Sequence, residues 1–139
     1  MYRGASTEDT LLYLAYNGRA FALDKATGRV VWRKDLDEAG DVCLHVEADA
    51  LFVACANVVM ALDPVTGALR WKTQLPLTSA MMPLMLVDAS GVYVTLGGEV
   101  ACVARDGALR WSDPMHGTGY GSPTLAVRGR SVRLETRSD

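Results

Sequence analysis

The sequence predicts an all-β protein: a β-propeller of four-stranded antiparallel blades, with about three blades in the chain. Two observations favour this fold. A segment that ends in Trp occurs three times, with its tryptophans at positions 32, 71 and 111, and short apolar segments bounded by turn residues lie between the copies. A repeat of about 40 residues that holds four short strands is typical of a propeller blade.

The repeated segment reads ALDKATGRVVW at 22–32 and ALDPVTGALRW at 61–71, and a shorter copy, CVARDGALRW, lies at 102–111. Its Asp is expected to accept hydrogen bonds from backbone N–H groups two or three residues later. Its Gly supplies the positive φ that a tight hairpin needs. The motif residues are Asp24, Thr27, Gly28 and Trp32, then Asp63, Thr66, Gly67 and Trp71, and finally Asp106, Gly107 and Trp111.

The strands are expected in groups of three, four, four and two. The first blade, about 11–41, has three strands and begins with LLYLAY. The second, about 42–80, has strands near 42–47, 51–56, 58–63 and 68–74, and the third occupies about 81–116. Residues 117–139 begin a partial blade. The segment 1–10 is polar and predicts no strand, so the first blade lacks its innermost strand. Period-two alternation further predicts that Leu69 and Trp71 share a face.

Composition and charge narrow the function classes. The chain is 50% apolar and 22% charged with a net charge of −2, which is globular and directs it neither to nucleic acid nor to an anionic membrane. No apolar run is long enough to span a membrane, and the first ten residues lack the core of a signal peptide. Cys43, Cys55 and Cys102 each lie in an apolar run and are expected to be reduced, buried thiols, which favours a cytoplasmic location. The absence of a CxxC motif argues against a metal site, and His45 is expected to be structural.

The pattern Ala-x-Asp-x-x-Thr-Gly-x-x-x-Trp resembles the tryptophan-docking motif of pyrroloquinoline-quinone (PQQ) type propellers. The first two copies match it fully, whereas the third keeps only Gly107 and Trp111, with Asp106 in a shortened turn. The resemblance covers nearly the whole chain from about residue 11. It implies that each Trp stacks on the backbone of a neighbouring blade.

Members of that family differ in function. Some are quinoprotein alcohol and glucose dehydrogenases, and others are non-catalytic, such as the propeller lipoprotein that helps to assemble outer-membrane proteins. Catalytic members resemble one another in a vicinal Cys-Cys pair and in acidic and amide residues that hold calcium. This chain has no adjacent cysteines, and its only asparagines are Asn17 and Asn57. We therefore expect no catalytic, cofactor-binding or metal-binding residues and a scaffold or recognition role. The alternatives are a PQQ- and calcium-dependent oxidoreductase, or a small-ligand sensor with its site at the ring axis.

Three blades do not close a propeller ring, which usually needs four to eight. The sequence therefore predicts a homo-oligomer, with a dimer favoured, in which two copies form about six blades and the extra strands allow seven or eight. The candidate interface, in which the C-terminal strand completes the first blade of another copy, consists of Thr124, Leu125, Val127 and Arg128. A different protein partner, or a longer propeller of which this chain is a part, are the alternatives.

Three local features have structural interpretations. The loop HGTGYGSP at 116–123 is expected to cross between blades, since no helix follows it to form a phosphate cradle. The segment AMMPLM at 80–85 is expected to fill the core, with an adaptable contact surface as the alternative. The charged residues of the last strands are expected to block pairing between sheet edges. These residues are Arg33, Arg70, Lys72 and Arg110.

Overall fold

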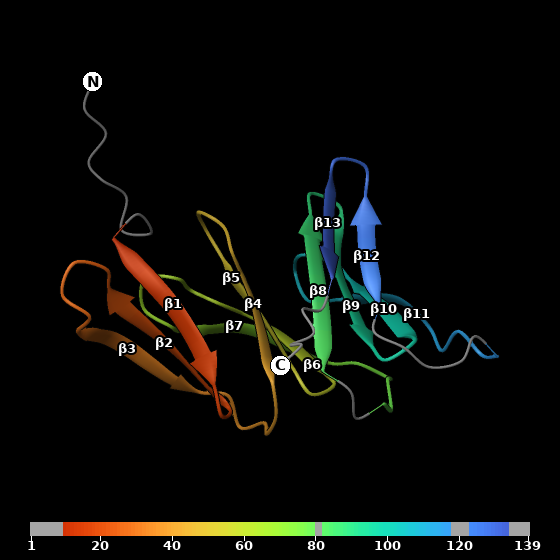
Figure 1. Ribbon diagram of the computed structural model, residues 1–139, viewed down its shortest axis with the longest axis horizontal. Coiled ribbons are helices and arrows are strands. Elements are labelled where there is room, and N and C mark those ends of the chain that lie inside the picture. The colour runs from red at the N-terminus through yellow and green to blue at the C-terminus, as the bar shows by residue number, and fades with distance from the viewer. Residues whose placement is uncertain (1–9, 80–81, 118–122, 134–139) are drawn as a thin grey trace, which may run out of the picture.

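The protein is described by a computed structural model that covers residues 10–79, 82–117 and 123–133, and these residues form strands and turns without any helix. Figure 1 shows the sheets fanned side by side, from β1 at one end to β11–β13 at the other. The strands are β1 (Leu11–Tyr16), β2 (Arg19–Asp24), β3 (Val30–Asp35), β4 (Val42–Val46), β5 (Leu51–Cys55), β6 (Val58–Leu62), β7 (Leu69–Gln74), β8 (Pro83–Asp88), β9 (Gly91–Leu96), β10 (Glu99–Val103), β11 (Leu109–Asp113), β12 (Thr124–Val127) and β13 (Arg130–Arg133).

The strands pair in sequence order within each sheet. Blade 1 is the three-stranded sheet β1-β2-β3, blade 2 is β4-β5-β6-β7, blade 3 is β8-β9-β10-β11, and β12-β13 form a separate two-stranded sheet. All the pairs are antiparallel. The predicted grouping of three, four, four and two strands is therefore confirmed. The described sheets form an open arc and not a closed ring (Figure 1).

Each Trp-bearing strand joins its sheet through a bulge. The register shifts at Ala61/Leu62 between β6 and β7, and at the equivalent positions of blades 1 and 3. As a result, Trp71 pairs with Ala61, and Leu69 pairs with Leu62. Ala61 and Leu62 are adjacent residues of β6 and point to opposite faces of the sheet, so their partners Trp71 and Leu69 also lie on opposite faces. The predicted common face for Leu69 and Trp71 is wrong, because the extra residue of the bulge reverses the alternation.

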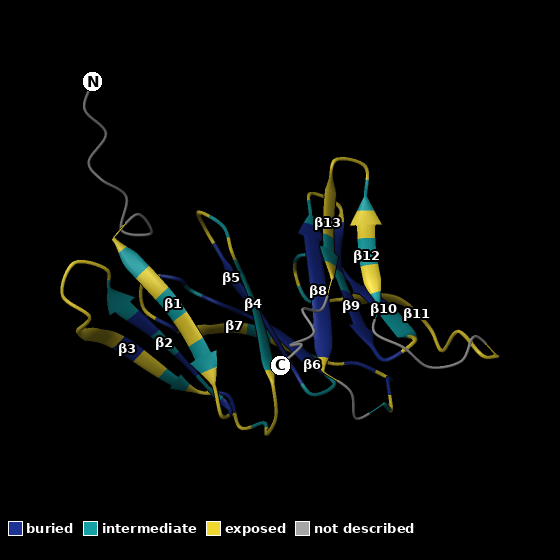
Figure 2. Ribbon diagram, viewed as in Figure 1, coloured by how far each residue is buried: buried dark blue, intermediate teal, exposed yellow. Residues whose placement is uncertain are grey.

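The core consists of two apolar layers, one between each pair of neighbouring blades. The first layer joins Ala20, Ala22 and Trp32 of blade 1 to residues of β5 and β6. The second joins Phe52 and Val59 of blade 2 to the inward side of blade 3. Because blade 2 is covered on both sides, β5 and β6 are buried along their whole length. Figure 2 shows this burial in the middle of the arc and the exposed residues of β1 and β3 at its end.

Several sequence predictions concern residues outside the described ranges. These are the polar segment 1–9, residues 80–81 of the methionine segment, most of the glycine-rich loop at 118–122, and the last residues, 134–139. Of the methionine segment, Met85 lies in the core whereas Met82 is 44% exposed. None of the described elements is a helix long and apolar enough to cross a membrane.

Candidate functional site

The indole of Trp32 docks on the β6–β7 turn of the next blade. Trp32 Nε1 donates a hydrogen bond to the Pro64 carbonyl oxygen at 3.0 Å, and the hydroxyl of Tyr13 donates to the same oxygen at 2.9 Å. The ring lies directly on Gly67, where a Cβ atom would stand 2.6 Å from Cε3 of the indole. Glycine is therefore required there for close approach as well as for its φ of 78°.

Trp71 repeats this contact one blade further on. Its Nε1 donates to the Arg105 carbonyl oxygen at 3.0 Å, and its ring covers Gly107, where a Cβ atom would lie 2.7 Å from Cδ2. The Thr73 hydroxyl also donates to the Gly107 carbonyl oxygen. The stacking of each Trp on the neighbouring backbone, which the motif implies, therefore occurs at both junctions between blades.

The Asp of the motif shapes the turn that receives the indole. Asp24 Oδ1 accepts the N–H of Ala26 at 2.8 Å, and Asp63 Oδ1 accepts the N–H of Val65 at 2.8 Å. The hydroxyls of Thr27 and Thr66 accept backbone N–H groups two residues later. The predicted Asx turns are thus present, and they build the same receiving surface in blades 1 and 2.

The turn of the first copy and the Trp of the third copy have no such partner among the described residues. Trp111 is 46% exposed, compared with 8% for Trp32. At the other end of the arc, a Cβ atom at Gly28 would meet nothing within 4 Å, although the φ of Gly28, 77°, matches that of Gly67. Within the described ranges, the arc therefore exposes an indole at one end and an uncovered turn at the other.

An ion pair bridges blades 2 and 3. Arg105 donates to the carboxylate of Glu47 and, at 2.9 Å, to the Asp88 carbonyl oxygen, and its guanidinium lies 5.2 Å from the ring centre of Phe52. The hydrogen bond from Arg105 is the main reason that the pKa of Glu47 is lowered. His45 Nε2 lies 3.0 Å from the same carboxylate. His45 thus has the hydrogen-bonded role expected of it.

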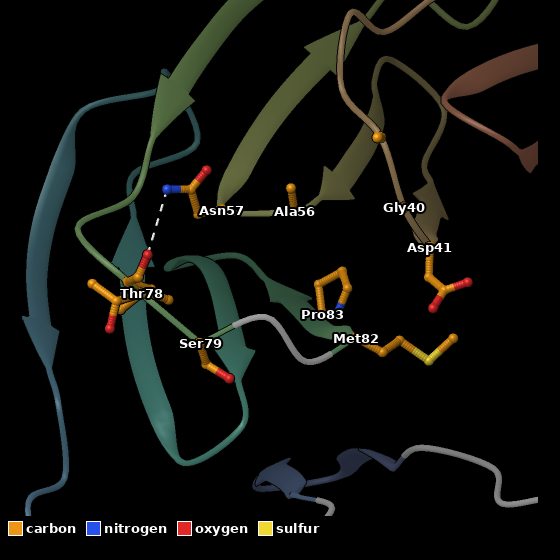
Figure 3. Close-up of a pocket in the computed structure, with 10 residues that line it drawn as sticks. Gly40, Asp41, Ala56, Asn57, Thr78, Ser79, Met82 and Pro83 are labelled. Atoms are coloured by element: carbon orange, nitrogen blue, oxygen red, sulfur yellow. Dashed lines mark hydrogen bonds between the residues drawn. The ribbon is translucent and has the colours of Figure 1, made fainter.

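A cleft of about 580 Å³ opens where loops of blades 2 and 3 meet (Figure 3). The β3–β4 loop, the β5–β6 turn and the β7–β8 loop with the first residue of β8 form its walls. Its size falls within the range of ordinary ligand pockets, about 300–1,000 Å³. Its lining residues are Ala39, Gly40, Asp41, Ala56, Asn57, Leu77, Thr78, Ser79, Met82 and Pro83.

Two side chains hold the β7–β8 loop against the blades. Asn57 Nδ2 donates to the carbonyl oxygens of Leu75 and Leu77, both at 3.4 Å (the latter in Figure 3). Glu99 of blade 3 accepts the N–H of Ser79 at 2.7 Å and that of Thr78 at 3.1 Å. The sequence does not reveal these roles, because the partners lie about twenty residues apart and no repeated motif connects them.

The described residues do not offer the donor set expected for a PQQ–calcium centre. Calcium takes six to eight oxygen ligands, largely carboxylates and carbonyls. No three His, Cys, Asp or Glu side chains in the described ranges converge so as to hold a metal ion. Cys43, Cys55 and Cys102 are free, and burial raises the pKa of each thiol.

The predicted interface residues lie on β12 and the turn that follows it. Thr124 and Arg128 are exposed, whereas Leu125 and Val127 are half-buried. Thr124 pairs with Arg133 across the β12–β13 hairpin, and Arg130 donates to the carbonyl oxygen of Val87 on β8. In the described sheets, the edge of β12 opposite β13 carries no strand. The role of these residues in pairing with another copy stays a prediction.

The fold and the repeated indole docks define the class of protein: an open β-propeller segment built from PQQ-type repeats. A family model described as outer membrane protein assembly factor BamB matches residues 2–133, and the chain belongs to this family. No curated protein sequence matches the chain.

Solved structures share the fold at low sequence identity. BamB from Moraxella catarrhalis is 22% identical with a TM-score of 0.57, over 76% of this chain and 33% of that one. Quinohemoprotein alcohol dehydrogenase from Comamonas testosteroni is 16% identical with a TM-score of 0.61, over 89% and 30%. The β-propeller domain of Cps50 (Swd1) from Myceliophteria thermophila is 17% identical with a TM-score of 0.60, over 81% and 41%. The alignments thus cover between 30% and 41% of these proteins.

Proposed function

We propose that this chain is a non-catalytic propeller scaffold that recognises a protein or peptide partner and assembles with other copies of itself. The observation that carries the proposal is the cleft between blades 2 and 3, whose walls are braced by Asn57 and Glu99. A braced cleft costs little conformational entropy when a partner binds. Membership of the BamB family, described as an assembly factor, supports a role in binding proteins.

The chemistry of the cleft suits an extended peptide. Polar contacts are offered by the backbone of the β3–β4 and β7–β8 loops, by the hydroxyls of Thr78 and Ser79, and by the Asp41 carboxylate. Met82, which is 44% exposed, adds an adaptable apolar contact at the rim. The three free cysteines accord with the proposal that the chain works in a reducing compartment such as the cytoplasm.

The test is selection of binding peptides from a displayed library, followed by affinity measurements on two variants. We expect Met82→Arg, at the cleft, to weaken binding at least tenfold. Met115→Arg is the control, because Met115 is 41% exposed but lies in the loop after β11. Equal effects of the two substitutions would mean that the cleft is not the binding site.

The competing functions are a quinoprotein oxidoreductase and a small-ligand sensor with its site at the ring axis. The likeness to the Comamonas dehydrogenase shows the shared fold alone. Thermal unfolding with PQQ and calcium discriminates, because a ligand present at a hundred times its Kd stabilises the fold by about 2.7 kcal/mol. We expect no shift in Tm, and a shift of several degrees would overturn the non-catalytic proposal.

A further inference from the structure

We propose that a second copy of this chain docks head to tail, with Trp111 of one copy packed on the Asp24–Gly28 turn of the other. This inference rests on the proposed self-assembly and names its surface. The chain contains two complete docks of the same kind, and the described structure leaves one unpaired half of a dock at each end. The two free halves are therefore complementary.

The receiving turn of blade 1 already has the geometry that binds an indole in blade 2. Gly28 N–H donates to the Asp24 carbonyl oxygen at 2.8 Å, and Gly67 N–H donates to the Asp63 carbonyl oxygen at 2.7 Å. The carbonyl that accepts an indole N–H in blade 2 belongs to Pro64, directly after Asp63. The corresponding carbonyl in blade 1 is that of Lys25, which we assign as the acceptor for Trp111 Nε1.

The outward face of blade 1 is apolar, like the face of blade 2 that a neighbouring blade covers. Leu12, Leu14 and Tyr16 are 53%, 42% and 59% exposed. They lie on the face opposite Ala20 and Ala22, which pack on blade 2. The equivalent face of β5 in blade 2 carries Leu51, Val53 and Cys55, which are all 0% exposed because blade 1 covers them. Blade 1 thus presents the surface that blade 2 buries, and no sheet of the described residues covers it.

Charge at the proposed contact is also complementary. Two residues after Trp71, the hydroxyl of Thr73 donates to the Gly107 carbonyl oxygen of the receiving turn, so this position lies against the turn. A carboxylate at this position cannot donate such a bond, but it can pair with cations of the turn. The residue two positions after Trp111 is Asp113, and the turn that would receive it carries Lys25 and Arg29. An exposed carboxylate would therefore meet two exposed cations, which favours this partner over a copy in another orientation.

The contact is directional, since an indole on one copy meets a turn on the other. Such a heterologous interface generates a closed ring when its rotation closes. Two-fold self-pairing through Trp111 alone would leave the Gly28 turn uncovered. A copy without the Trp111 indole and a copy with an altered Gly28 turn should therefore still form one intact contact with each other.

The test uses Trp111→Ala and Gly28→Ala, measured by sedimentation velocity alone and mixed. The matched control is Gly117→Ala, because Gly117 has a φ of 79° and likewise nothing within 4 Å of an added Cβ. We expect the wild type and the control to sediment at twice the chain mass of 15.0 kDa or more. Each damaged variant should self-associate with a Kd at least about 30-fold higher than that of the wild type. An equimolar mixture should form a one-to-one pair, because Gly28→Ala still donates an intact Trp111.

Circular dichroism first confirms that each variant is folded. The double variant Asp113→Lys/Lys25→Glu, which reverses both charges of the proposed contact, is expected to restore part of the self-association lost in Asp113→Lys alone. A wild type that stays at the single-chain mass up to about 100 μM, or a mixture that forms no pair, would overturn the proposal. Peptide binding at the Met82 cleft by monomeric Trp111→Ala is a separate readout, so loss of self-assembly and loss of the recognition function are distinguishable.

Discussion

The close approach of Gly67 to Trp32 makes a quantitative prediction for Gly67→Ala. An added Cβ would lie 2.6, 2.7 and 3.1 Å from three carbon atoms of the indole, so the ring must leave the turn. Burial of a Trp removes about 150–250 Å² from water. If about 100 Å² of it becomes exposed, the cost is about 2.5 kcal/mol. Loss of the bond to the Pro64 carbonyl adds about 1 kcal/mol.

The strain of an alanine at positive φ must be separated from the loss of the dock. Gly117→Ala carries the same strain, since its φ of 79° is close to the 78° of Gly67, and its Cβ would touch nothing. We therefore expect Gly67→Ala to lower the free energy of unfolding by about 3.5 kcal/mol more than Gly117→Ala does.

Urea unfolding followed by circular dichroism measures this difference. With a denaturant slope of about 2 kcal/mol/M, the midpoint of Gly67→Ala should fall about 1.7 M below that of Gly117→Ala. The emission of Trp32 should also shift to the red as the indole meets water. If both variants unfold within about 0.3 M of each other, the indole dock contributes little to stability and the reasoning is refuted.

Three further predictions concern single contacts. Trp71→Phe keeps an aromatic ring but loses the N–H that bonds the next blade, so it should cost about 1–1.5 kcal/mol in urea unfolding of the monomer. Trp111→Phe is its exposed control and, in the monomer without the proposed contact to a second copy, should stay within about 0.5 kcal/mol of wild type. Glu99→Ala removes the acceptor of the loop N–H groups, so hydrogen exchange at Ser79 should accelerate at least tenfold while exchange in β5 is unchanged; unchanged exchange at Ser79 would show that the loop is held by other contacts. Because the pKa of Glu47 is lower in the folded state than its ordinary 4.5, its stabilising effect is full above pH 4.5 and is lost as the pH falls through the lowered value. Glu47→Gln should flatten that acid dependence of stability, and an acid limb identical to that of wild type would contradict the assignment.

The sequence was sufficient for features that one repeat specifies locally. The Asx turn at Asp63 and the positive φ of Gly67 arise within five residues of each other, because a carboxylate and a glycine impose them on a short turn. The grouping of strands followed from the spacing of apolar segments and turns. The stacking of Trp32 and Trp71 on the next blade followed from the family resemblance, and the structure supplied the two acceptor carbonyls.

Alternation alone misplaced Leu69 relative to Trp71. The bulge that reverses the two faces depends on how β7 meets β6, and a residue count along one strand contains no information about that pairing. The Glu47–Arg105 pair was missed for a related reason, since its partners lie 58 residues apart on different blades.

The amino-acid order by itself determined the blades and their turns, because each results from chemistry within one repeat. Only the tertiary structure decided which copy of a repeated residue is buried. Trp32 and Trp111 each end a copy of the repeated segment, yet one is 8% and the other 46% exposed, because burial depends on whether a further blade lies against the ring. The braced cleft is likewise a tertiary feature, since it exists only where loops from two blades meet.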